Sequence, residues 1–515
     1  MMIDLLTLIL FIPSLGALLL LFLPREQEKL IKWSAFVISL VPLGLSIYLW
    51  TVFDATKNGF QFETTYVWYA AIHSSYHVGI DGLSLTMVML TTLLMPLAIL
   101  ASFSIKDRIK SYMILFFFLE TGLLGVFLSL DLLVFFVFYE IGLVPMFFII
   151  NQWGSEHGER EIWGGRKMSA RAYASIKFMI YTMAASLGLL LAIQLIGVSA
   201  GTYDLKELFK VWPTLQTFNH ITLAWQPDTI KAVAFWAFVI AFALKVPVWP
   251  FHTWLPDAHT EAPVAGSMIL AGVLLKLGAY GFLRLVLPLF PAQSAHYAGW
   301  LGLMAILAII LGAFAAYGQN DFKRLVAYSS VNHMGFVVLG IAAAAAAIGT
   351  ENATIALNGA VFQMFNHGLS AAGMFFLVGV IYERTHTRNL DEYGGLFPLM
   401  PVYGGILIFT AMGSLGLPGL SGFISEFLVV RGSWPIFTLY TALAMIGLLF
   451  TGAYVLKGIK QVLHGPLNEK WSGHISEINV REIIVITPLM ILMLWLGLWP
   501  SSVLEVINRA VTMLF

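Results

Sequence analysis

Cysteine is absent from this 515-residue chain, and charged side chains make up only 11% of it. Without cysteine, the chain cannot form disulfides, thiolate-held iron–sulfur clusters or cysteine zinc sites. Soluble domains are roughly a quarter charged, so this low content excludes a water-soluble enzyme. The formal net charge is zero, which leaves no basic surface that would bind nucleic acid.

Apolar residues fill the chain instead, at 59% of its length. Apolar runs of about 18 or more residues recur from end to end, and each is long enough to cross a bilayer as a helix. The pattern predicts an all-α, polytopic membrane protein embedded in the lipid bilayer, with about 14 transmembrane helices. These spans lie near residues 3–23, 31–53, 82–104, 112–129, 132–152, 172–197, 231–255, 263–287, 299–318, 323–348, 354–382, 400–431, 435–459 and 482–500.

The distribution of basic residues supports this number of spans. Seventeen of the 28 Lys and Arg residues lie in connections after odd-numbered spans, seven lie after even-numbered spans or in the C-terminal tail, and four lie inside spans. Short cytoplasmic loops collect Lys and Arg, so we expect an even number of spans with both termini on the non-cytoplasmic side. The first apolar stretch has no basic residue before it and no cleavage site after it, so we expect a retained span.

Charged side chains inside spans are candidates for function, because each costs roughly 2.5–3.5 kcal/mol at bilayer depth. Glu140 lies near mid-membrane in span 5, and Pro145 favours a kink close to it. Lys245 in span 7 is followed by Pro247 and Pro250, which interrupt a regular helix and free carbonyl groups. A lysine beside such a break is the usual setting of an ion site in transporters.

Two further charged residues have comparable surroundings. Lys276 in span 8 has small neighbours, which favours burial among other helices rather than exposure to lipid. Glu426 in span 12 follows a second interruption, in the stretch SLGLPGLSGFISEF. Both residues are therefore candidates for the same chemistry as Glu140 and Lys245.

The remaining polar residues within spans are ambiguous when taken one at a time. His333 and His367 carry the side chains that titrate nearest neutral pH, although a lone intramembrane histidine often only joins two helices. Lys177 and Lys457 lie near helix ends and can reach the interface. Glu120 has no helix breaker nearby and is left unassigned, while His73, His77, His252 and His259 fall in loops or at helix ends without metal-ligand spacing.

Buried Glu, Lys and His side chains share the capacity to take up and release protons. Burial disfavours the charged form of each group, and an opposite charge at close range restores it. Two such groups are switched when their separation changes. We therefore expect a path of titratable groups that carries protons and is driven by conformational change or charge displacement.

The order of the spans indicates an internal repeat. Spans 4–8 and 9–13 form two blocks of five, and an odd number of helices inverts the second block relative to the first. Corresponding spans carry comparable features, with broken helices 7 and 12 at Lys245 and Glu426. Inverted repeats with broken helices are a transporter architecture. The expected divisions are residues 1–110 (helices 1–3), 111–290 (first repeat), 291–465 (second repeat) and 466–515 (helix 14).

Several stretches resemble a known family: FYEIGLVPM, ALKVPVWPFHTWLPDAHTEAPVAGSMILAGVLLKLGAYGFLR, DFKRLVAYSSVNHMGF, NHGLSAAGMFFLVGVIYERTHTRNL and LGLPGLSGFISEF. They are similar to the antiporter-like membrane subunits of respiratory complex I, the proton-pumping NADH:quinone oxidoreductase. The match runs from about span 3 to span 13. Within that family, HGLSAAG and YERTHTR are most similar to the chain M group, called chain 4 in mitochondria.

The resemblance implies a membrane-arm subunit that translocates protons while NADH-to-quinone electron transfer takes place in other subunits. It implies that Glu140 and Lys245 form an input ion pair, that Lys276 is the central relay and that Glu426 leads toward the exit. His333 and His367 would line the path, and Lys177 would compete for Glu140.

The resemblance also defines the expected assembly. FMN, iron–sulfur clusters and quinone would be held by partner subunits, with no cofactor or metal on this chain. The chain would thus belong to an enzyme without carrying out redox chemistry itself. The neighbours would be the antiporter-like subunits L and N, and the expected location is a bacterial inner membrane.

Three alternatives stay open from the sequence. A subunit of a multi-subunit cation/proton antiporter would share these features, as would a subunit of a ferredoxin- or hydrogenase-linked proton pump. A membrane scaffold, in which the buried charges only hold helices together, is the third. Neutralising Lys245 or Glu140 separates transport from scaffolding, because only a transport subunit loses pumping while it still assembles.

Overall fold

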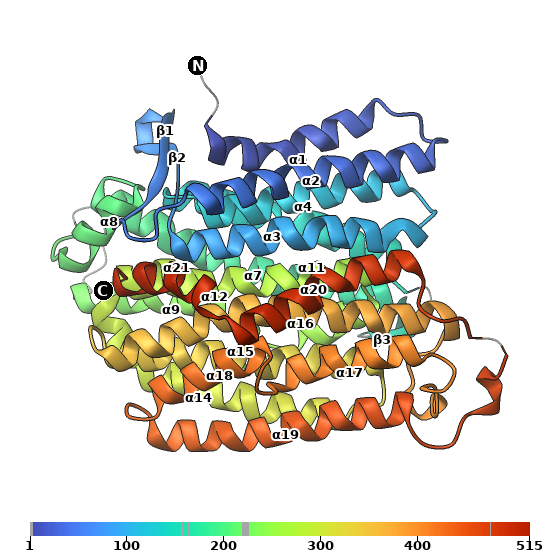
Figure 1. The fold of residues 1–515 in the computed structure, drawn as a ribbon. Coiled ribbons are helices and arrows are strands. Elements are labelled where there is room, and N and C mark those ends of the chain that lie inside the picture. The colour runs from blue at the N-terminus through green and yellow to red at the C-terminus, as the bar shows by residue number, and fades with distance from the viewer. Residues whose placement is uncertain (1–3, 156–157, 163, 219–225, 474, 515) are drawn as a thin grey trace.

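The computed structural model describes residues 4–155, 158–162, 164–218, 226–473 and 475–514. Its long helices lie side by side with roughly parallel axes and form one bundle (Figure 1). Within the described residues, twelve spans are long and apolar enough to cross a membrane, and two shorter apolar helices accompany them, α1 (Leu5–Leu21) and α17 (Pro401–Leu415). The predicted all-α membrane architecture with about fourteen spans is confirmed.

The spans follow the predicted order along the chain. Spans 1–3 are α1, α2 (Glu28–Val52) and α3 (Gly82–Ala101). Spans 4–8 are α4 (Ile109–Leu128), α5 (Leu132–Ile141) with α6 (Leu143–Trp153), α7 (Ala170–Ala200), α9 (Pro227–Lys245) with α10 (Trp254–Glu261), and α11 (Val264–Ile269) with α12 (Leu275–Gly281) and α13 (Leu287–Leu289). Spans 9–14 are α14 (Pro291–Tyr317), α15 (Phe322–Ala346), α16 (Glu351–Thr385), α17 with α18 (Ser421–Ser433), α19 (Thr438–Leu463) and α20 (Val480–Leu498).

Short elements that hydropathy did not predict occupy the connections. Two antiparallel hairpins pair β1 (Gln61–Tyr69) with β2 (Ser74–Ile80) and β3 (Glu159–Ile162) with β4 (Arg166–Ser169). Two short helices are added, α8 (Leu205–Val211) and the amphipathic α21 (Ser501–Thr512) at the C-terminal end. The β1–β2 hairpin, α8 and the end of α21 lie at the same end of the bundle (Figure 1).

An aspartate at the N-cap fixes where several helices begin. Its carboxylate accepts a hydrogen bond from a backbone N–H that has no partner within the helix. At α5, for example, Asp131 accepts from the N–H groups of Leu133 and Val134 at 2.9 and 3.0 Å. The aspartates that cap helices in this way are Asp4, Asp81, Asp131, Asp204 and Asp321.

The two blocks of five spans share a backbone contact at corresponding places. Before α5, an isolated β-bridge joins Asp131 to Asp204, which follows span 6. Before α15, a second bridge joins Asp321 to Asn389, which follows span 11. The first contact lies after span 4 and the second after span 9, so they fall at opposite ends of the bundle. This relationship agrees with an inverted repeat.

The predicted helix interruptions are present. Span 7 breaks after Lys245 and resumes at Trp254 of α10. Span 12 breaks after α17, where Gly416 and Gly419 have φ of 82° and 95°, a conformation that favours glycine, and it resumes as α18. Span 5 is interrupted at Gly142, and α6 begins at the next residue, Leu143.

Span 8 has an irregularity of another kind. Two π-helical segments, Leu270–Leu274 and Phe282–Val286, flank α12. A π segment widens the helix by one residue and is frequent at functional sites. Lys276 is the second residue of α12, immediately after the first of these segments.

Spans 8, 10 and 11 form the enclosed centre of the bundle, where nearly all side chains are buried. The outer helices α2, α7, α19 and α20 instead expose large apolar side chains, such as Leu191 and Leu449. In a membrane protein these surfaces face lipid. The titratable groups described below lie mainly on the enclosed helices, which separates them from lipid.

Candidate functional site: a buried series of titratable side chains

Lys245 is the last residue of α9, at the first helix break. Its side chain is buried, and its Nζ lies 4.5 Å above the ring centroid of Tyr139 on α5. The ammonium has no hydrogen-bond partner among the described residues. Cation–π attraction to Tyr139 therefore replaces only part of the lost hydration. Such a group responds strongly to any nearby change in charge.

Glu140 follows Tyr139 at the end of α5. Its carboxylate is the charge that acts on Lys245, yet no ion pair within 4.0 Å joins the two residues in the described part of the chain. One carboxylate oxygen, Oε1, is buried without a partner. The structure thus brings the expected input pair into one neighbourhood, with the ring of Tyr139 beside Lys245 in place of a direct contact.

Lys177 of α7 has a different partner from the one expected. Its Nζ lies 2.6 Å from Oδ2 of Asp257 on α10. Arg324 approaches the other oxygen of Asp257 at 3.2 Å, and Arg160 approaches it at 4.0 Å. The structure therefore places Lys177 in a cluster of cations around Asp257 rather than against Glu140. Asp257 lies within the stretch WLPDAHTE, but the sequence alone gave it no role.

Lys276 is fully enclosed at the centre of the bundle. Its Nζ donates to the carbonyl of Ala271 at 2.5 Å, within the π-helical segment that precedes α12. The same nitrogen lies 2.7 Å from Nδ1 of His367 on α16. The irregular helix thus supplies a carbonyl for the ammonium, and the imidazole is its neighbour for proton exchange. Spacing along the chain could not have revealed this pair, since 91 residues separate its members.

His367 leads to a second histidine. The ring centroids of His367 and His333 are 5.8 Å apart, and both side chains are buried. On its far side, His333 Nδ1 lies 2.9 Å from Oε1 of Glu426. Its Nε2 lies 3.2 Å from the hydroxyl of Ser414 and 3.3 Å from that of Tyr454.

Glu426 is held at the second helix break. Gln363 donates from its side-chain nitrogen to Oε1 of Glu426 at 3.1 Å, and Ser425 in turn donates to the Gln363 amide oxygen. A side chain at Gly416 would press on the other carboxylate oxygen at 3.3 Å, so the glycine leaves room for it. The carboxylate is therefore oriented toward His333 by its surroundings.

These contacts join four predicted residues into one series: Lys276, His367, His333 and Glu426. The series passes from the π-distorted span 8 to the broken span 12 through α16 and α15. Imidazole can accept a proton on one nitrogen and release it from the other, so a pair of histidines between lysine and glutamate can pass protons along.

His259 is a buried polar residue near this series that the sequence did not single out. Its ring stacks on Phe375 with centroids 4.3 Å apart and planes 6° apart, and neither ring nitrogen has a hydrogen-bond partner among the described residues. The charges of Lys323 and Lys276 both act on it. Lys323 is itself buried and donates to the carbonyl of Ala262. Hydropathy had placed Lys323 in a connection, so only the folded structure reveals this grouping.

Two other charged residues within spans lie outside the series. Lys457 donates to the carbonyls of Tyr317 and Gln319 at 2.8 Å each, which agrees with the structural role considered for it. Glu120 of α4 is completely buried, and neither of its carboxylate oxygens has a partner among the described residues. No group of three or more potential metal ligands was found within the described residues.

Comparisons with known proteins assign the family. Residues 129–451 match the model of a transmembrane family described as "NADH:quinone oxidoreductase/Mrp antiporter, TM". The chain belongs to this family. NADH-quinone oxidoreductase subunit M of Rhodobacter capsulatus is 39% identical over 99% of this chain and 96% of that protein. The family resemblance expected from the sequence is therefore confirmed.

Solved structures have the same fold. A chain of respiratory complex I from Thermus thermophilus superposes with a TM-score of 0.83 at 26% identity, covering 99% of both chains. A chain of the Mrp complex from Dietzia superposes with a TM-score of 0.82 at 20% identity, over 98% of this chain and 96% of that one, which shows a shared fold.

Proposed function

We propose that the chain is a proton-translocating subunit of the membrane arm of NADH:quinone oxidoreductase. The observation that carries this proposal is the enclosed series from Lys276 through His367 and His333 to Glu426. A scaffold has no need for four titratable side chains in sequence at the least accessible part of the bundle, because each is costly to bury.

Protons move along the series by short transfers. The Lys276 ammonium donates to Nδ1 of His367 over 2.7 Å, and at the other end His333 Nδ1 donates to Glu426 over 2.9 Å. Both separations lie in the range for direct transfer. Between the two rings, one bridging water or a rotation of a ring completes the path, since 5.8 Å between centroids is too long for a direct bond.

Lys245 and Glu140 act as the control of this path. When Glu140 approaches Lys245, it stabilises the ammonium; when it withdraws, the buried lysine favours release of its proton. Lys177 is available to pair with Glu140 only after it leaves Asp257, to which it is now bonded at 2.6 Å. Movement of Lys177 from the Asp257 carboxylate to the Glu140 carboxylate would therefore change the protonation state of Lys245.

The remaining features of the assembly belong to the same proposal. Electron transfer takes place in partner subunits that hold FMN, iron–sulfur clusters and quinone, and the neighbouring membrane subunits are the antiporter-like L and N. The bundle resides in a bacterial inner membrane with both termini on the non-cytoplasmic side, as the excess of basic residues after odd-numbered spans favours. The four divisions expected from the sequence describe its organisation, with the two bridge contacts at Asp131 and Asp321 in support of the repeat.

The proposal is tested by reconstituting the whole complex in proteoliposomes with the chain carrying Lys245→Ala. Proton pumping is followed by quenching of a pH-sensitive dye, and NADH oxidation is measured in the same sample. The proposal predicts that pumping per NADH oxidised falls by the share that this chain carries, while the complex still assembles. Lys457→Ala, which removes a lysine bonded only to carbonyls, is the matched control and should keep normal pumping.

Two results would contradict the proposal. Equal pumping by the Lys245→Ala and unmodified complexes would mean that this chain does not carry protons. Proton uptake driven by a sodium gradient, without any NADH oxidation, would favour the cation/proton antiporter whose fold the chain also shares.

A further inference from the structure

A cavity of about 410 Å³ lies at the end of the bundle that holds the β1–β2 hairpin and α21, away from the titratable series. Its walls come from the loop after α2, the start of α3, α8, the end of span 8 and α21. Most of its lining is apolar, including Phe53, Phe60, Phe209, Leu287, Val506 and Met513. The volume lies in the range of pockets that bind ligands.

Helix α21 closes the cavity and is fixed in place by two contacts. A Cβ at Gly82, the first residue of α3, would lie 1.9 Å from the carbonyl oxygen of Val506, so only glycine permits this approach. At the other end, the N–H of Gly59 donates to the Met513 sulfur at 3.2 Å. Helix α21 is thus packed against the rest of the fold, although it follows the last transmembrane span.

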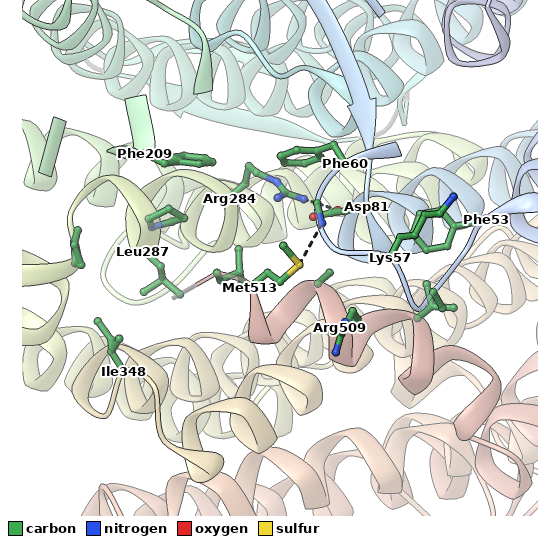
Figure 2. Close-up of a pocket in the computed structure, with 18 of the residues that line it drawn as sticks. Phe53, Lys57, Phe60, Asp81, Phe209, Arg284, Leu287, Ile348, Arg509 and Met513 are labelled. Atoms are coloured by element: carbon green, nitrogen blue, oxygen red, sulfur yellow. Dashed lines mark hydrogen bonds and ion pairs between the residues drawn. The ribbon is translucent and has the colours of Figure 1, made fainter. Parts of the chain in front are cut away.

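Arg284 brings a positive charge into the apolar cavity. The side chain is 2% exposed, and its Nη2 donates to Oδ1 of Asp81 at 2.6 Å while Nε donates to the Tyr280 hydroxyl at 3.1 Å. Its Nη1 makes no hydrogen bond to any described residue. This nitrogen is not one of the fully buried side-chain atoms that lack a hydrogen-bond partner. Figure 2 shows the guanidinium next to Phe60 and directed toward Asp81. One donor is therefore left for a ligand.

Two further cations line the cavity. They are Lys57 and Arg509 of α21 (Figure 2). Arg509 has no ion-pair partner among the described residues, and the Nζ of Lys57 lies 3.9 Å from the Asp54 carboxylate. Asp81 is the one acidic residue in the lining, and it is already paired with Arg284. The cavity therefore has an excess of positive charge around an apolar interior.

The three cations lie at the same end of the bundle. Lys57 follows span 2, Arg284 lies near the end of span 8 and Arg509 follows span 14. Helix ends mark the depth of lipid headgroups, and the apolar side chains lie next to them. The charge and the apolar lining are thus arranged like the two parts of a phospholipid.

We propose that this cavity binds an anionic glycerophospholipid, with its phosphate at Arg509, Lys57 and the free Nη1 of Arg284 and an acyl chain among the apolar side chains. A free phosphate would leave the apolar lining without a partner, whereas a neutral lipid would leave the cations without one. Basic residues near a membrane surface attract anionic headgroups.

The test uses the purified full chain in phosphatidylcholine vesicles that contain a phosphatidylglycerol probe with a photoreactive group on one acyl chain. After illumination, mass spectrometry locates the cross-linked peptides. The proposal predicts cross-links to the peptides that contain Phe209, Leu287 and Met513, at higher yield than those on the lipid-facing helices α7 and α19. The double variant Lys57→Gln/Arg509→Gln should lower the pocket yield by at least about fivefold.

Matched controls keep the result specific. Arg25→Gln/Lys29→Gln removes two exposed cations from the opposite end of the bundle and should leave the pocket yield unchanged. Ala510→Phe fills the cavity and should remove the pocket cross-links. Lys57 and Arg509 form no buried ion pair with any described residue, so the glutamine variant tests the charges without disturbing the fold.

Three results would overturn the proposal. Equal pocket labelling by a phosphatidylcholine probe would show that charge has no part in binding. Competition by inorganic phosphate at concentrations that leave the outer helices labelled would indicate a free-anion site. Labelling spread evenly over the lipid-facing surface would show that the cavity holds no lipid.

Discussion

The Nζ of Lys276 lies 2.7 Å from Nδ1 of His367 in the centre of the membrane bundle. A protonated lysine donates to this nitrogen only when the imidazole presents a lone pair there, so the pair fixes the tautomer of neutral His367. The other ring nitrogen, Nε2, has no partner among the described residues. It is the atom from which a proton can continue toward His333.

The first prediction concerns His367 itself. His367→Asn removes the ring that receives the proton from Lys276 in the proposed path, so proton pumping per NADH oxidised should fall by the share that this chain carries. Proton uptake by proteoliposomes containing the assembled complex measures this. His296→Asn, which changes an exposed histidine of α14, is the control and should pump normally. Equal pumping by both variants would exclude His367 from the path.

The second prediction separates the charge of Glu426 from its position. Glu426→Gln keeps the size of the side chain but replaces one carboxylate oxygen with an NH2 group that cannot accept a proton, so it should stop transfer from His333, whereas Glu426→Asp should retain partial activity. Pumping rates of the two reconstituted variants measure the difference. Glu351→Gln, at the exposed start of α16, should leave pumping unchanged. A fully active Glu426→Gln complex would show that the carboxylate is only structural.

The third prediction concerns the Arg284–Asp81 pair, whose atoms lie 2.6 Å apart in a buried setting. Removing one partner leaves an uncompensated buried charge, so Asp81→Asn should lower the free energy of unfolding by about 3–5 kcal/mol. Thermal unfolding of the purified chain in detergent measures the loss. The double variant Asp81→Asn/Arg284→Met should lose less than the sum of the two single variants, and strict additivity would show that the pair contributes nothing.

The fourth prediction is a pH dependence at the hairpin end of the bundle. His77 on β2 lies 2.6 Å from Asp204 and 3.1 Å from Glu63. Burial lowers the pKa of His77, but the hydrogen bonds and charges of Asp204 and Glu63 more than offset this and raise the pKa above its ordinary 6.5. Burial raises the pKa of Asp204, yet the hydrogen bond and charge of His77, together with hydrogen bonds from the backbone of Glu207 and Lys206, outweigh burial and hold that pKa below the ordinary 3.8.

The signs of these two shifts define a window. The stability that protonated His77 contributes to the folded state is complete below pH 6.5 and is lost as pH rises through its raised pKa. The stability that ionised Asp204 contributes is complete above pH 3.8 and is lost as pH falls through its lowered pKa. Protection of the β1–β2 backbone from hydrogen exchange should therefore be greatest between these values. In the His77→Gln variant, the loss of this protection at higher pH should disappear. If protection depends on pH in the same way in the variant as in the unmodified chain, the pH dependence does not come from His77.

Hydropathy and the positions of proline residues predicted the membrane spans and the helix break, because these features depend on the sequence of a single segment. Long apolar runs can only be membrane helices, and Pro247 with Pro250 cannot continue a helix, so the spans and the break after Lys245 were accessible from the sequence. The hairpin β1–β2 and helix α21 were missed because their stability comes from packing on the bundle rather than from a long apolar run. Secondary structure at the surface of a membrane protein has a weaker signal of its own.

The sequence named the four residues of the buried series but not the contacts that join them. Lys245, Lys276 and Glu426 were candidates because burying a charge in the membrane costs free energy. The family resemblance added His333 to the expected path. Sequence could not show that Lys177 pairs with Asp257, because 80 residues separate them and only the fold brings α7 beside α10. His259 was overlooked since its position at a helix end resembled that of an exposed residue, whereas α10 is in fact buried along its whole length.

The most direct test replaces Lys276 with methionine, which keeps the length of the side chain but can carry no proton. Protons pumped per NADH oxidised are measured in proteoliposomes that contain the assembled complex, with the same variant checked for assembly. Because the variant interrupts the path between spans 8 and 12, we expect a large fall in the number of protons pumped per NADH oxidised, while the complex still assembles. A ratio equal to that of the unmodified complex would contradict the conclusion that protons pass through this series of side chains.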